Sequence, residues 1–99
     1  MAQQSKISSN NTRVFYNKEY DRCEVFLHAT RILSIDDGVV TLNSGGWQSV
    51  TTKTRMNQCA KEWELGFGVF QTKGKWYVKK PGFEYDEAVP FSDGMQFHI

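Results

Sequence analysis

One segment of this 99-residue chain has helical periodicity, and short strand-like segments flank it on both sides. Its apolar residues recur at positions i, i+3, i+4 and i+7, which places them on one face of a helix. They are Met56, Cys59, Ala60 and Trp63. We predict one α-helix near 52–65, with Thr51 or Thr52 as the N-cap and Gly66 as the C′ residue. A single helix with one apolar face needs a sheet to pack against, so this pattern favours an α+β fold.

Two turn signals divide the strand-like segments into hairpins. Asp36-Asp37-Gly38 and Thr72-Lys73-Gly74 each join two β-rich runs, and tight hairpin turns need the positive φ angles that glycine readily adopts. The expected strands cover residues 13–16, 23–28, 30–35, 39–42, 47–50, 67–71, 75–79 and 95–99. This order predicts a strongly bent antiparallel sheet or a small open barrel of about 6–8 short strands, with the helix covering one end or one face.

The composition, 39% hydrophobic and 14% aromatic, is sufficient for one packed core. We expect residues 1–12, which are rich in Ser, Asn and Gln, to form a flexible polar tail, and residues 13–99 to form a single α+β domain. The chain has no signal-peptide pattern and no apolar run of about 18–20 residues, which predicts a cytoplasmic protein without a membrane partner. Cys23 and Cys59 lack C-x-x-C spacing and are expected to be reduced and buried.

Charge is unevenly distributed along the chain, although the formal net charge is only +1. Residues 53–80 contain seven basic and two acidic residues, whereas residues 81–99 contain four acidic residues and no Lys or Arg. This asymmetry could place a basic patch on the surface. Equally, the two segments could neutralise each other in the fold.

The stretch Leu42–Asn57, LNSGGWQSVTTKTRMN, has the composition of an anion-binding site. Glycines allow the backbone to approach a ligand closely, hydroxyls and free helix N–H groups donate hydrogen bonds, and cations supply charge. An aromatic side chain could stack on a nucleotide base. The predicted ligand-binding residues are Ser44, Gly45, Gly46, Trp47, Thr51, Thr52, Lys53, Arg55 and Tyr77.

The charges of the predicted helix support this interpretation, because they oppose the helix dipole. Lys53 and Arg55 lie at its start, while Glu62 and Glu64 lie at its end. Each misplaced charge costs about 0.3–1 kcal/mol at an exposed helix end, unless an anion is bound at the N-terminus. No established phosphate-loop pattern matches the segment. The alternative is an ordinary Gly-Gly turn and a solvated helix start, with Ser and Thr as caps. An acidic side chain from another protein, or Asp86 and Glu87 folded back, could also fill the site.

Other kinds of site receive less support from the sequence. The two histidines and two cysteines contain no pair at metal-ligand spacing, and nothing identifies a nucleophile or an acid–base pair. We therefore predict no catalytic residue, no metal and no cofactor. Tyr77 beside the lysines of residues 73–80 could bind single-stranded nucleic acid, whereas Trp76 is expected in the core. The alternating segment Met95–Ile99 could pair with a second copy of the chain.

Three segments resemble small proteins of tailed bacteriophages: LNSGGWQSVTTKTRMN, GVFQTKGKWYV and VPFSDGM, which together span roughly residues 39–96. The resemblance carries no functional residues. It implies a small binding protein that acts in the host cytoplasm on a defence or regulatory system, for example by sequestering a nucleotide signal. The alternatives are a protein inhibitor of a host or immune complex such as a CRISPR effector, with the acidic 84–93 segment mimicking nucleic acid, and a nucleic-acid-binding regulator.

Overall fold

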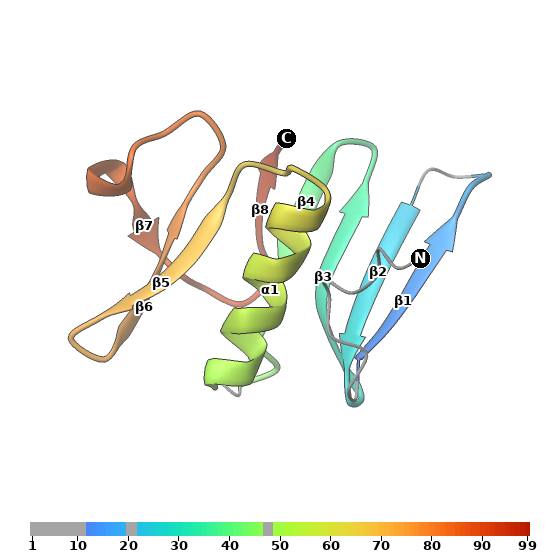
Figure 1. Cartoon of the computed structure of the whole chain (residues 1–99), viewed down its shortest axis with the longest axis horizontal. Coiled ribbons are helices and arrows are strands. Elements are labelled where there is room, and N and C mark those ends of the chain that lie inside the picture. Colours follow the sequence, from blue (N-terminus) through green and yellow to red (C-terminus); the bar gives the residue numbers. More distant parts are fainter. Residues whose placement is uncertain (1–11, 20–21, 47–48) are drawn as a thin grey trace.

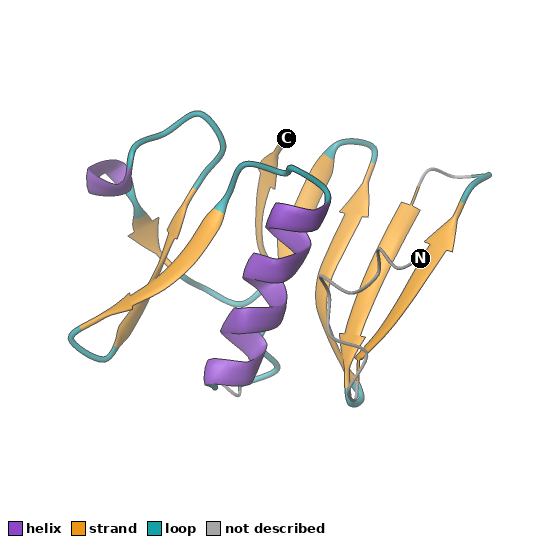
Figure 2. Ribbon diagram, in the orientation of Figure 1, coloured by secondary structure: helices purple, strands orange, loops and turns teal. Residues whose placement is uncertain are grey.

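The computed structural model describes residues 12–19, 22–46 and 49–99, and within these ranges the chain forms eight strands and one α-helix (Figures 1 and 2). The α+β class, the antiparallel pairing and the single helix are confirmed. The elements are β1 (Thr12–Asn17), β2 (Arg22–Leu27), β3 (Thr30–Asp36), β4 (Val39–Leu42), α1 (Val50–Glu62), β5 (Gly68–Thr72), β6 (Lys75–Lys79), the 3-10 turn η2 (Tyr85–Glu87), β7 (Val89–Pro90) and β8 (Met95–His98). Thr12, which we expected in the tail, begins β1; the rest of that tail lies outside the described residues.

The strands form two separate antiparallel sheets. The larger has the order β1-β2-β3-β4-β8, and the smaller has the order β5-β6-β7. Figure 1 shows α1 running between them, and the helix contacts β3 of the larger sheet and β5 of the smaller one. Neither sheet closes into a barrel. After β7 of the smaller sheet, the chain returns to the larger sheet, where the C-terminal strand β8 pairs with β4.

Tight turns join the hairpins where the sequence indicated them. Asp37 and Gly38 have φ angles of 54° and 77°, and Lys73 and Gly74 have φ angles of 54° and 80°. Two successive positive φ angles match the right-handed twist of the flanking strands. A third tight turn, His28-Ala29, joins β2 to β3, and His28 also has a positive φ of 56°.

The core lies between α1 and the two sheets. Alternation on β2 buries Cys23, Val25 and Leu27, while Trp76 and Val78 on β6 face the same interior. Met56 and Cys59 on α1 are 0% exposed, as the apolar stripe predicted. The larger sheet and the helix bury further side chains: Ile32, Leu33, Val40, Leu42, Ala60 and Phe97. Both cysteines are free and buried; burial raises the pKa of Cys59 to about 12, and it also raises the pKa of Cys23.

The helix begins and ends earlier than the sequence predicted. Ser49 is the N-cap, not Thr51 or Thr52: its hydroxyl accepts a hydrogen bond from the Thr52 backbone N–H at 3.2 Å. The strand expected over 47–50 is also wrong for its described part, because Ser49 caps the helix and Val50 belongs to it. Within the described ranges, no helix is long and apolar enough to cross a membrane.

The C-terminal end of α1 forms a Schellman motif around Glu64, not Gly66. The Leu65 N–H donates to the Ala60 carbonyl at 2.8 Å, and Glu64 takes the left-handed conformation with a φ of 50°. This pattern of bonds defines the motif and puts Glu64 at C′. Leu65 and Ala60 are both buried, which is the apolar contact that accompanies such an ending.

Candidate functional site

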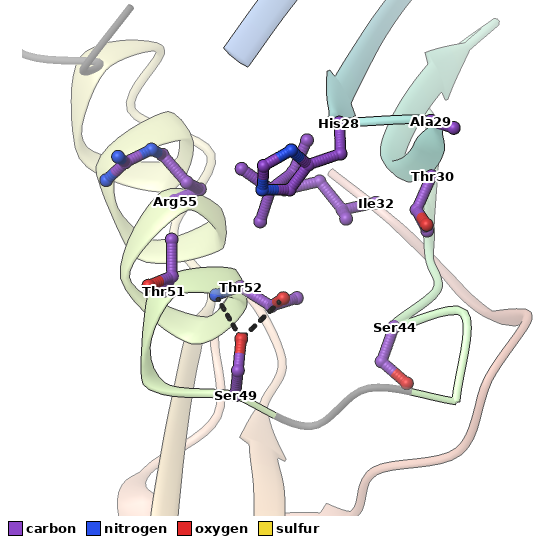
Figure 3. A pocket seen from close by; sticks show the side chains of 10 residues that line it. His28, Ala29, Thr30, Ile32, Ser44, Ser49, Thr51, Thr52 and Arg55 are labelled. Atoms are coloured by element: carbon purple, nitrogen blue, oxygen red, sulfur yellow. Dashed lines mark hydrogen bonds between the residues drawn. The ribbon is translucent and has the colours of Figure 1, made fainter. Parts of the chain in front are cut away.

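A pocket of about 530 Å³ lies between the start of α1 and the β2–β3 turn (Figure 3). Such a volume is within the usual range for small-molecule sites, about 300–1,000 Å³. One side is formed by the helix start, the other by the turn and the beginning of β3. The residues that line it are Leu27, His28, Ala29, Thr30, Ile32, Ser44, Ser49, Thr51, Thr52 and Arg55.

The helix side of the pocket offers hydrogen-bond donors. Ser49 caps the Thr52 N–H, and the Lys53 N–H donates to the Ser49 carbonyl at 3.1 Å. The N–H groups of Val50 and Thr51 precede the first possible intrahelical acceptor, and none is found for them among the described residues. Thr51 is exposed and adds a hydroxyl. Thr52 is 3% exposed, and its hydroxyl is bonded to that of Ser49 at 3.0 Å, so it supports the cap.

The sheet side of the pocket is built on the His28-Ala29 turn. The positive φ of His28 turns its side chain toward the helix, where Figure 3 shows the imidazole opposite Arg55 and Thr52. Histidine adopts this backbone region more readily than most residues. The His28 carbonyl accepts a hydrogen bond from the Arg13 guanidinium at 3.2 Å, which ties the turn to β1.

Arg55 supplies a cationic group to the pocket wall. Its Nε donates to the Thr12 hydroxyl at 3.0 Å, and one terminal nitrogen donates to the Gln58 amide oxygen at 3.4 Å. Both acceptors are neutral, so the guanidinium charge is not compensated by these contacts. No Asp or Glu is among the described residues that line the pocket. An imidazole, a guanidinium and hydroxyls without a carboxylate form a wall that suits an anion.

The Ser44-Gly45-Gly46 loop uses its donors within the protein. The Ser44 N–H and hydroxyl both donate to one Asp93 carboxylate oxygen at 2.7 Å, and the Gly45 N–H donates to the Asn43 side-chain oxygen at 2.7 Å. The Gly46 N–H donates to the Ser44 hydroxyl at 3.2 Å. A Cβ at Gly45 would lie 2.7 Å from Thr30 Cγ2, so this glycine permits close packing of the loop against β3.

The structure brings together only some of the predicted site residues. Ser44, Thr51, Thr52 and Arg55 line the pocket, whereas Gly45, Gly46 and Lys53 do not. Tyr77 lies on β6 of the smaller sheet and stacks on Phe70 with ring centroids 5.8 Å apart. Trp47 lies outside the described residues.

The sequence interpretation missed the sheet side of the pocket. His28 was assigned to the preceding strand, and Thr30 to the next, so nothing placed them opposite the helix. The two-residue gap between Leu27 and Thr30 is the length of a tight hairpin loop, which is the signal that could have identified the turn.

The earlier helix start also weakens the inference that Lys53 and Arg55 oppose the helix dipole and so favour a bound anion. Lys53 ends the first turn of α1, but Arg55 lies in the second turn, where the helix dipole has little effect. Asp86 and Glu87 do not fold back to this helix end: they belong to η2, where the Glu87 carboxylate accepts the Glu84 N–H at 2.8 Å. Asp93, bonded to Ser44, is the acidic residue that lies beside the glycine loop.

The basic residues of 53–80 are distributed over separate elements. Lys73 and Lys75 lie at the β5–β6 turn, whereas Lys53, Arg55 and Lys61 lie along α1. Lys79 and Lys80 are positioned over the rings of Tyr85 and Phe83, at 5.7 and 5.0 Å from the ring centroids. The described residues form no ion pair between the basic and the acidic segment. Their ion pairs join Arg22 to Glu24 and Asp36, and Arg31 to Glu24. They also contain no cluster of three His, Cys, Asp or Glu that could hold a metal.

Comparison with known proteins identifies the family. No curated protein and no solved structure matches the chain. The sequence model of one family, described as Kyanoviridae Gp96 protein, matches residues 1–98. The match covers almost the whole chain and agrees with the resemblance to bacteriophage proteins. The chain is therefore a bacteriophage protein that belongs to the Kyanoviridae Gp96 family.

Proposed function

We propose that this phage protein is a non-enzymatic binding protein that holds a small anionic ligand of nucleotide type in the pocket between α1 and the β2–β3 turn. The observation that carries the proposal is the composition of the pocket wall. His28, Arg55 and the Thr51 hydroxyl border a volume of about 530 Å³, and no carboxylate borders it among the described residues. The N–H groups at the helix start favour a negative group at the same place.

The pocket supports binding rather than chemistry. Hydrogen bonds to Thr12 and Gln58 fix the position of the Arg55 guanidinium, and the hydroxyl of Thr52 is used by the cap. An arrangement of this kind can recognise charge and shape, but it presents no activated nucleophile. In an infected host cell, such a protein would lower the free concentration of its ligand in proportion to its own abundance. That would suit counter-defence or host takeover by sequestration of a nucleotide signal.

A thermal-shift experiment tests the proposal. The probes are inorganic phosphate, mononucleotides and cyclic nucleotides, and we expect one nucleotide class to raise the melting temperature of the wild-type chain, because a ligand that binds only the folded state stabilises it. Arg55→Ala and His28→Asn should abolish the shift. His28→Asn keeps a residue that tolerates positive φ, so the turn can be retained.

Lys61→Ala is the matched control, because it removes one positive charge from the same helix at its exposed far end. It should leave the shift intact. If no probe moves the melting temperature of the wild type, the small-ligand function is wrong. If Lys61→Ala abolishes the shift as completely as Arg55→Ala does, the effect is one of net charge and the pocket is not the site.

One observation favours a second candidate, a protein inhibitor that covers a functional surface of its partner. The three residues of η2 and the two before it are exposed, so Glu84, Asp86 and Glu87 lie in one short segment with Tyr85 and Phe83, which are 61% and 44% exposed. Carboxylates beside aromatic rings could imitate the phosphates and bases of a nucleic acid. In this case nucleotides would leave the melting temperature unchanged, and a bait carrying Asp86→Lys and Glu87→Lys would lose a host protein that the wild-type bait retains.

A further inference from the structure

The smaller sheet has one face in the core and one turned away from it. Alternation on β6 buries Trp76 and Val78, and Val69 of β5 is buried with them. Successive side chains of a strand point to opposite faces, so Phe70 and Tyr77 lie on the outer face. They are opposite each other in the register of β5 and β6, and their rings are stacked with centroids 5.8 Å apart and an angle of 25° between the ring planes. Both residues are partly exposed, so the outer face presents a pair of nearly parallel rings.

Tyr85 of η2 adds a third ring to this face. Its ring packs edge-on against Phe70, with centroids 5.5 Å apart, and the residue is 61% exposed. A Cβ at Gly68 would lie 3.1 Å from the Tyr85 hydroxyl oxygen, so this glycine provides the space in which the ring lies against the start of β5. The rings of Phe70, Tyr77 and Tyr85 therefore form one aromatic row, which packing holds in place.

Lysine side chains border the aromatic row. Lys75 and Lys79 lie on either side of Tyr77 along β6 and on the same face of the sheet, and Lys73 lies in the turn between β5 and β6. None of these three lysines forms an ion pair within the described residues. The Lys79 ammonium donates to the Gly66 carbonyl at 3.0 Å, and this acceptor is neutral. The positive charges are therefore not compensated by direct contact with a carboxylate of the described chain.

The carboxylates of η2 limit where a negative ligand can lie. This turn and the residue before it carry three of them, at Glu84, Asp86 and Glu87. Figure 2 shows η2 and the β5–β6 turn at opposite ends of the smaller sheet. A polyanion is therefore attracted to the turn end, where Lys73 and Lys75 lie, and repelled from the η2 end.

We propose that the outer face of the smaller sheet binds a single-stranded nucleic acid, whose bases stack on Phe70 and Tyr77 and whose phosphates lie at Lys73 and Lys75. Aromatic side chains on which bases stack, beside cations that follow the backbone, hold single strands without reading their sequence. A sheet face with exposed aromatic rings is one of the arrangements that bind single-stranded RNA. The bases of a duplex are stacked on each other, so their faces are not accessible to these rings. None of the four residues lines the pocket at the helix start, so this is a separate site.

A nucleic acid fits this face better than an acidic protein segment does. Both would bring negative charge to the lysines, but an acidic side chain offers the aromatic rings no planar group on which to stack. The rings of Phe70 and Tyr77 are already nearly parallel. Bases stacked on them would remain nearly parallel to each other, as consecutive bases of a single strand are.

Fluorescence anisotropy with labelled oligonucleotides tests the proposal on the full chain. The probes are oligothymidylate DNA and oligouridylate RNA of about 12 nucleotides, within the usual range of single-strand sites, and a DNA duplex of the same length. At low salt the wild type should bind a single strand more tightly than the duplex, and the affinity should fall as salt rises. Lys75→Ala should weaken binding and make its salt dependence less steep, and Tyr77→Leu should weaken binding about fivefold or more.

Lys61→Ala and Phe15→Leu are the matched controls, since they remove a charge from α1 and an exposed ring from the larger sheet. Both should bind like the wild type, and so should Arg55→Ala, which alters the pocket at the helix start. The proposal is overturned if neither single strand binds, if the duplex binds equally well, or if any of these three variants loses as much affinity as Lys75→Ala or Tyr77→Leu. Polyglutamate that competes as well as unlabelled oligothymidylate would also overturn it, because the face would then recognise negative charge alone.

Crosslinking decides the matter if Tyr77→Leu fails to fold, because it uses the wild-type chain. Ultraviolet light joins iodouracil in a single strand to an aromatic side chain that stacks on it. Mass spectrometry of the digested chain should locate the crosslink at Phe70 or Tyr77. Crosslinks confined to other residues overturn the proposal.

Discussion

Asn57 makes the polar connection between the helix and the smaller sheet. Its side-chain nitrogen donates to the Val69 carbonyl, and the Val69 N–H donates to its side-chain oxygen, both at 2.8 Å. A side-chain amide has a donor and an acceptor on one planar group, so it can satisfy both backbone groups of a strand residue. β5 is the strand with the most contacts to the helix, so these two bonds fix the position of β5 along the axis of α1.

Asn57→Ala should lower the free energy of unfolding by about 2–4 kcal/mol, because it leaves a part-buried donor and acceptor at Val69 without partners, at roughly 1–3 kcal/mol each. Urea denaturation followed by circular dichroism measures the change. Gln71→Ala, at an exposed position on the same strand, is the control and should cost little. Equal midpoints for the two variants would show that the Asn57 bonds contribute nothing.

Single residues also show where the sequence sufficed for the site and where it did not. Thr51 and Arg55 were identified because their residue types and their place near a helix start are local properties. His28 could not be identified in that way, because its contribution comes from a turn 27 residues from Arg55 along the chain. The glycines were predicted to let a ligand approach the backbone. Gly45 does allow a close approach, but the group that approaches it is the Thr30 side chain.

At the scale of elements, α1 shows that a buried contact can decide where a helix ends, against the usual preference for glycine after its C-terminus. Gly66 was the expected C′ residue because glycine favours positive φ. The helix instead ends at Glu62, since this brings Leu65 back onto Ala60 in the core. Glu64 consequently takes a φ of 50°, and its carboxylate lies at the helix end where negative charge is unfavourable.

Glu64→Gly should therefore raise the free energy of unfolding by about 0.5–1 kcal/mol, because relief of the left-handed backbone strain exceeds the added entropy of the unfolded chain. Thermal denaturation measures the effect. Glu64→Ala separates the two contributions, since it removes the charge and retains the strained backbone; it should be less stable than Glu64→Gly. The reverse order would mean that the strain at this position is negligible.

At the scale of the whole molecule, the sequence predicted strands and turns but not the division into two sheets. Hairpins such as β3–β4 and β5–β6 depend on local turns, which the Asp-Gly and Lys-Gly signals indicated. The pairing of β4 with β8 joins Val40 to Phe97 across most of the chain. Alternation in Met95–Ile99 identifies a strand, but it carries no information about which of the available edges that strand will join.

Phe97 is the residue through which this long-range pairing holds the two sheets together. It is 7% exposed, lies opposite Val40 in the larger sheet, and packs edge-on against Phe67, with ring centroids 5.3 Å apart, just before β5 begins. Its side chain therefore touches the segment that leads into the smaller sheet. Loss of the ring should weaken both sheets at once, which is the behaviour of a single cooperative domain.

Phe97→Ala should lower the free energy of unfolding by about 3–5 kcal/mol, the usual cost of removing a buried phenyl ring. Two probes should report one transition: tryptophan fluorescence, to which buried Trp76 of the smaller sheet contributes, and far-ultraviolet circular dichroism, which follows all strands and the helix. Ile99→Ala, at a position that is 49% exposed, is the control for the same strand end. Separate midpoints for the two probes would show that the two sheets unfold independently, because coupling through Phe97 requires them to lose structure together.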